Sequence, residues 1–128
     1  MSYTIDRTFE GADFEAIDKR TREALAANGF GVLTEIDVKA TMKKKIDKDM
    51  EDYRILGACN PGMAWQAMGL EPKVGAMLPC NVILRGVPGG VEVSAIDPRA
   101  SMSSIDNDEL KAVAGEVREM MAKVVAAI

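Results

Sequence analysis

The sequence contains no histidine and only two cysteines among its 128 residues. Histidine is the commonest metal ligand and the general base with a pKa nearest neutral pH, so its absence excludes the usual metal centres and acid–base sites. With two cysteines, a four-ligand zinc site would need carboxylates or a second subunit. We therefore predict no metal site of that kind, and the sequence identifies no cofactor.

Long apolar segments are also missing. No charged N-terminal region precedes an apolar core, and no run approaches the roughly 18 apolar residues that a membrane span needs. We expect a cytoplasmic protein with no membrane partner. Thiols are kept reduced in that compartment, so Cys59 and Cys80 are expected to be free or transiently paired.

Basic residues are outnumbered, with 16 lysines and arginines against 20 acidic residues and a net charge of −4. Phosphate backbones repel such a chain, so we predict no nucleic-acid partner. The run Lys43-Lys44-Lys45 is a local exception, best explained as a solvated helix face. No glycine-rich phosphate loop is present, because Gly86, Gly89 and Gly90 lack the required spacing, and Pro88-Gly89-Gly90 instead indicates a hairpin turn.

Length and a hydrophobic content of 48% predict a single domain over residues 1–128 with a core of its own. Apolar periodicity predicts the order β-α-β-β-β-β-α, with short helical segments at 38–50 and 61–68, and residues 74–78 left between strand and loop. The expected fold class is α+β, a curved antiparallel sheet with two long helices packed on one face. The strands are expected at 3–9, 30–36, 53–58, 80–86 and 91–96, and Arg7 breaks the alternation of the first strand. The long helices are expected at 13–28 and after an N-cap at Asp106.

The stretch 53–84 holds the unusual chemistry, because each cysteine is followed by asparagine and bordered by proline. Asn60 is a good N-cap, Pro61 suits the first helical position, and Gly69 is placed to end the helix. A helix N-terminus favours a thiolate, so Cys59 is predicted to be the more reactive thiol. If the flanking strands are antiparallel neighbours, the Cys59 and Cys80 sulfurs lie within about 10 Å at one sheet edge. The alternative is two buried structural thiols.

The motifs ILGACNP, EP, LPCNV and IDP, in this order, resemble the signature of the DUF302 family, and the similarity extends over essentially the whole chain. This resemblance implies a small α+β domain of the TATA-binding-protein-like fold class, usually dimeric and without an established activity. Family members often carry histidine in the short helix, at the position that we align with Trp65.

Three functions remain open, and the first is a non-catalytic homodimeric module that binds a small ligand or a partner protein. Methionine and tryptophan would form the walls of its pocket and asparagine would orient the ligand. The second function is redox or sulfur-transfer chemistry, with Cys59 as nucleophile and Cys80 as resolving thiol. The third is soft-metal, Cu(I), or haem-linked binding through cysteine and methionine. The candidate binding residues are Cys59, Asn60, Met63, Trp65, Met77, Cys80 and Asn81.

A homodimer is also expected because open sheet edges invite pairing. By sequence, the outer strands are Tyr3 to Phe9 and Val91 to Ile96, and either could lie on a two-fold axis. In the competing arrangement, the 38–52 segment or the helices cover the edges within one subunit.

Overall fold

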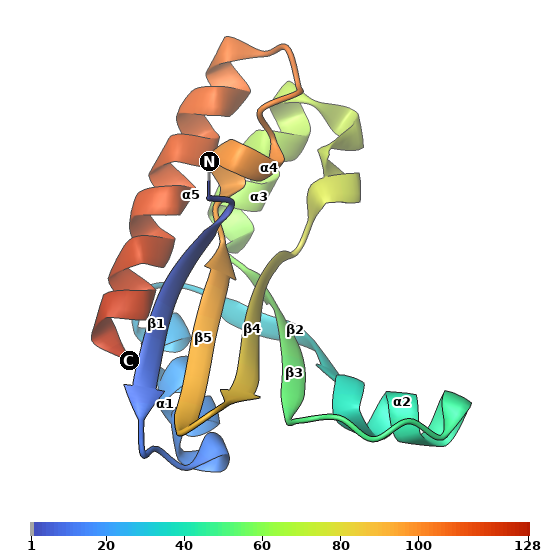
Figure 1. Cartoon of the computed structure of the whole chain (residues 1–128). Helices are drawn as coiled ribbons and strands as arrows, with labels where there is room; N and C mark the ends of the chain where they lie inside the picture. Colours follow the sequence, from blue (N-terminus) through green and yellow to red (C-terminus); the bar gives the residue numbers. More distant parts are fainter. Residues whose placement is uncertain (1) are drawn as a thin grey trace.

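One antiparallel sheet with the strand order β1-β5-β4-β3-β2 organises the computed structural model, which describes residues 2–128 (Figure 1). The five strands are β1 (Thr4–Glu10), β2 (Gly31–Asp37), β3 (Tyr53–Cys59), β4 (Cys80–Val87) and β5 (Gly90–Ile96). The helices are α1 (Phe14–Ala27), α2 (Val38–Ile46), α3 (Pro61–Leu70), the 3₁₀ helix η1 (Pro72–Met77), α4 (Pro98–Ser101) and α5 (Asp108–Ala127).

The two long helices cover the same face of this sheet, as predicted. Helix α1 packs on β4 and β5, α5 packs on β1 and β5, and the two helices contact each other. Apolar side chains at helical spacing on each helix fill the space above the alternate strand residues that point toward them. The α+β fold class and the antiparallel sheet are therefore confirmed. The largest fully buried side chains of this core include Ile17, Leu25, Leu56, Leu84 and Met121.

Arg7, which interrupts the apolar alternation of β1, has a structural role on the helix-facing side of the sheet. Its Nη1 donates hydrogen bonds to the backbone oxygens of Val125, Ala126 and Ile128, at 3.2, 2.9 and 3.0 Å. Its guanidinium also lies 4.7 Å from the centre of the Phe9 ring. The last carbonyls of a helix have no partner within the helix, so a cation here completes the end of α5.

Three local predictions were wrong. The N-cap of α5 is Asn107, whose Oδ1 accepts from the Leu110 N–H at 3.0 Å, and not Asp106. Helix α3 continues through Gly69 to Leu70 and ends at an extended Glu71, so Gly69 does not adopt a left-handed conformation. Residues 74–78 add nothing to a strand, because Glu71 and Pro72 begin the 3₁₀ helix η1.

The edges of the sheet also differ from the expectation. The strand Val91 to Ile96 is internal, because β5 pairs with both β1 and β4, and the true edges are β1 and β2. The 38–52 segment does not cover the β2 edge. Helix α2 instead extends away from the sheet (Figure 1) and has no buried residue. Four large apolar side chains, Leu33, Ile36, Met42 and Ile46, are therefore exposed on β2 and α2.

Candidate functional site

The two cysteine tripeptides meet where β3 ends and β4 begins. The strands are antiparallel neighbours, and Ala58 of β3 is the register partner of Cys80 of β4. Immediately after β3, the Asn60 side chain accepts a hydrogen bond from the Met63 N–H at 3.1 Å, and Pro61 opens α3. The predicted cap is thus confirmed, and it places the N-terminus of α3 beside the end of β3.

A small apolar cavity lies at this end of the sheet, between the strands, α3 and α5. The volume inside it that the centre of a water molecule can occupy is about 30 Å³. A water molecule whose centre can move through this space does not fill the cavity, so the cavity has room for a small guest and not for a large organic molecule. Its walls are formed by Phe30, Ala58, Cys59, Asn60, Met63, Ala64, Ala67, Leu78, Cys80, Pro98, Met102, Val113, Ala114 and Val117.

Sulfur is the distinctive element of these walls, since Cys59, Met63, Cys80 and Met102 all line the cavity. Both cysteines are free thiols. Cys80 and its register partner Ala58 lie on the helix-facing side of the sheet. Successive residues of a strand point to opposite faces, so the Cα–Cβ bond of Cys59 points to the other side. Cys80 is buried and Cys59 is only partly covered. The structure therefore gives the two thiols different environments around one cavity.

Burial sets the protonation state of the inner thiol. Removal from water, with a smaller effect from the neighbouring Cys59, raises the pKa of Cys80 to about 11. Cys80 is therefore a neutral thiol at physiological pH. A protonated thiol is a weak nucleophile, which argues against Cys80 as a resolving thiol in redox chemistry.

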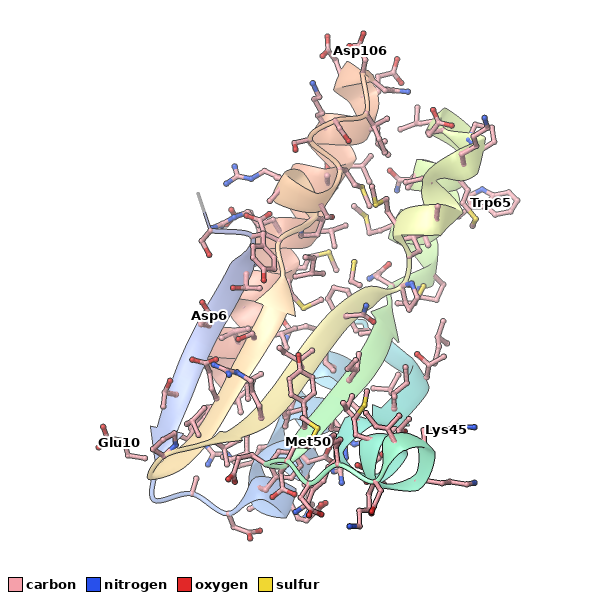
Figure 2. All side chains as sticks on the ribbon, turned by 45° about the vertical axis from the view of Figure 1, so that its right-hand side comes forward. Asp6, Glu10, Lys45, Met50, Trp65 and Asp106 are labelled. Carbon is pink, nitrogen blue, oxygen red and sulfur yellow. The ribbon has the colours of Figure 1, made fainter. Side chains whose placement is uncertain are left out.

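Three of the predicted binding residues lie outside the cavity. Trp65 is 78% exposed and points away from the body of the protein (Figure 2). Met77 of η1 is 41% exposed, and Asn81 is an exposed residue of β4. Of the seven candidates, the structure brings together Cys59, Asn60, Met63 and Cys80.

Other wall residues were missed by the sequence analysis because they come from distant segments. Met102 follows α4 and is buried at 5% exposure, while Val113, Ala114 and Val117 belong to α5. Apolar periodicity predicted the last long helix, but it does not specify which residues of that helix face the sheet and which face α3. Met102 reaches the site because the chain turns back toward the cavity after Pro98, and only the structure shows this.

Among residues 2–128, no three histidine, cysteine, aspartate or glutamate side chains are grouped so that they could hold a metal ion. The same part of the chain contains no helix that is long and apolar enough to cross a membrane.

The fold and the cavity define a small α+β domain with an antiparallel sheet, helices on one face and a sulfur-lined pocket at one end. The chain belongs to the family described as domain of unknown function DUF302, whose model matches residues 5–128. The crystal structure of an uncharacterised conserved DUF302 protein from Bacillus stearothermophilus is similar, with a TM-score of 0.92 and 21% identity over 99% of this chain and 98% of that chain. This likeness shows the fold. No curated protein matches the chain.

Proposed function

We propose that this chain is a non-catalytic binding module that holds a small ligand in the sulfur-lined cavity under α3, and that it works as a homodimer. The ligand-binding proposal is supported mainly by the position of Cys59, Met63 and Cys80, which all line one apolar cavity. A concave apolar site with a few distinctive groups is the usual form of a ligand pocket.

The size of the cavity limits the class of ligand. The centre of a water molecule can occupy about 30 Å³ inside the cavity. A cavity of this size admits a gas molecule, a single ion or the apolar end of a longer molecule. The walls offer few polar partners, because the Asn60 Oδ1 already caps α3. A strongly hydrated ligand would lose its water without replacement, so an apolar or soft ligand is favoured.

Xenon is a suitable probe of such a cavity, because apolar cavities bind it without specific chemistry. In protein labelled with ¹³C at the methionine methyl groups, we expect xenon to shift the NMR signals of Met63 and Met102. The signals of Met42 and Met68, which are exposed on α2 and α3, serve as internal controls. Ala64→Leu should fill the cavity and abolish the response, with the fold checked by circular dichroism. Unchanged Met63 and Met102 signals under xenon would remove the proposed pocket.

The dimer proposal is supported by the sheet face that no helix covers. Ile36, Ile55 and Ile83 are register partners across β2, β3 and β4, so they form one apolar row on that face. Beside it, α2 carries exposed Met42 and Ile46, which contact no core of their own chain. Apolar surfaces of this kind mark interaction sites.

Charge favours a second copy of the chain as the partner. Asp6 and Glu10 lie on β1 at one edge of the sheet, while Lys45 lies on α2 at the opposite edge (Figure 2). If two open faces pack together about a two-fold axis that runs parallel to the strands, the lysines of each α2 lie beside the acidic β1 of the other copy. The same patch then serves both subunits, as in an isologous dimer.

Light scattering at micromolar concentration tests this arrangement. We expect twice the chain mass of 13.8 kDa for the native protein, and Ile36→Lys should shift the mass toward that of one chain. Trp65→Gln is the matched control, because it removes an exposed apolar side chain from α3, away from the proposed interface. A native mass near 13.8 kDa would overturn the dimer.

A further inference from the structure

Three sulfur-containing side chains from separate segments line the cavity. Cys80 begins β4, Met63 lies in the first turn of α3, and Met102 follows α4. Met63 packs against both apolar clusters of the core, one containing Cys80 and the other containing Met102. Helical periodicity explains Met120 and Met121 on the core-facing side of α5, but it does not explain this convergence.

We propose that the ligand of this cavity is a single soft monovalent metal ion, Cu(I), held by the Cys80 sulfur and by the thioether sulfurs of Met63 and Met102. Thiolate and thioether ligands select Cu(I) over harder ions. The inference rests on the proposed function, because it names the ligand class for the same cavity. A single ion also suits a cavity of about 30 Å³.

Charge neutrality explains why a monovalent ion fits. When Cu(I) binds, a Cu–S bond forms, the S–H bond breaks, and the proton leaves to solvent. The resulting thiolate and ion cancel, so no net charge is buried. A divalent ion such as Zn²⁺ would leave one uncompensated positive charge in an apolar environment, which is unfavourable.

Cys59 lines the same cavity, but strand alternation starts its side chain from the face opposite to Cys80, and we leave it out of the proposed ligand set. It is partly exposed and would bind soft metals by itself. The experiment is therefore made in the Cys59→Ser background, where Cys80 is the remaining thiol.

Anaerobic competition with the Cu(I) chelator bicinchoninate measures the affinity. We expect one Cu(I) per chain, no binding after an added Cys80→Ser, and affinity lowered about tenfold by either Met63→Leu or Met102→Leu. Leucine nearly conserves the volume of methionine, so the fold should be retained. Met68→Leu is the matched control, since Met68 lies on the same helix as Met63 but is exposed outside the cavity.

Three results would overturn the metal site: equal affinity in the methionine variants, which would mean binding by a thiol alone; Cu(I) binding that survives Cys80→Ser; or Zn²⁺ bound as tightly as Cu(I). If Met102→Leu does not fold, the partly exposed Met63 carries the test. A cavity that responds to xenon but not to Cu(I) leaves the proposed function standing and removes only the metal.

Discussion

Asn60 Oδ1 accepts a hydrogen bond from the Met63 backbone N–H at 3.1 Å, which fastens the first turn of α3 to the end of β3. Replacing an N-cap asparagine by alanine costs about 1 kcal/mol. We therefore expect Asn60→Ala to lower the free energy of unfolding by that amount and to speed amide exchange in α3. Urea denaturation and hydrogen exchange measure the two effects. Asn81→Ala, at an exposed β4 position, should change neither, and an equal loss in both variants would contradict the capping role.

The two thiols should react at very different rates. Burial raises the pKa of Cys80 to about 11, so at pH 7 to 8 it presents little thiolate, the form that reacts with iodoacetamide. Cys59 is less buried and lies beside the N-terminus of α3. We expect Cys59 to be alkylated first in the native protein, as mass spectrometry of timed samples will show. Faster modification of Cys80 would mean that the cavity is open to solvent.

An ionic cluster between β3 and α1 should make stability depend on acid pH. Arg54 Nη1 lies 3.0 Å from Asp18 Oδ2, and Arg22 Nε lies 2.7 Å from Asp18 Oδ1. Burial opposes ionisation of Asp18, but hydrogen bonds from the two arginines outweigh it and hold its pKa below 3.8. A depressed pKa stabilises the fold above the pKa of the unfolded chain, and this stability is lost as the pH falls below about 3.8.

Asp18→Asn should accordingly lower the free energy of unfolding at pH 7 by about 2 kcal/mol, the scale of hydrogen bonds to a charged group. The difference from the native protein should shrink at pH 3, because the Asp18 carboxyl of the unfolded chain, whose pKa is near 3.8, is protonated there and favours unfolding of the native protein. Thermal unfolding at both pH values measures this. Glu23→Gln is the control on the same helix, because the Lys19–Glu23 pair is exposed and contributes little. A deficit that is unchanged at pH 3 would contradict the electrostatic explanation.

Gly57 of β3 lies against the side chains of Thr34 and Pro79, which leave no room for a Cβ atom. A Cβ at this position would lie 2.8 Å from Pro79 Cγ and would overlap the Thr34 side chain. Gly57→Ala should therefore destabilise the protein by about 1–3 kcal/mol, the cost of overpacking. Gly31→Ala on β2 is the control, because nothing lies within 4 Å of its added Cβ. Equal chemical denaturation midpoints for the two variants would contradict this reading.

Local chemistry predicted much of the fold. Asn60 and Pro61 start α3, and the apolar stripe from Leu110 to Val124 lies on α5, because capping and periodicity act within one segment. Arg7 broke the strand pattern for a reason outside its segment, namely the end of α5. The internal position of β5 was missed because strand order depends on pairing between distant segments.

The candidate site was predicted in part for the same reason. The cysteine tripeptides indicated Cys59, Asn60 and Cys80 because adjacent antiparallel strands bring those segments together. Trp65 was predicted as an apolar wall of the pocket, but its position on α3 turns it to solvent. Met102 was missed because no local pattern predicts that the chain returns over α3 after β5.

The most direct test of the account is a crystal of the protein pressurised with xenon and examined by anomalous diffraction. Xenon reports an apolar cavity by position. We expect one xenon atom among Met63, Cys80 and Met102 in the native protein, and none there in the Ala64→Leu variant. Xenon bound only elsewhere on the molecule, with these three side chains closed against one another, would contradict the binding site on which the proposed function depends.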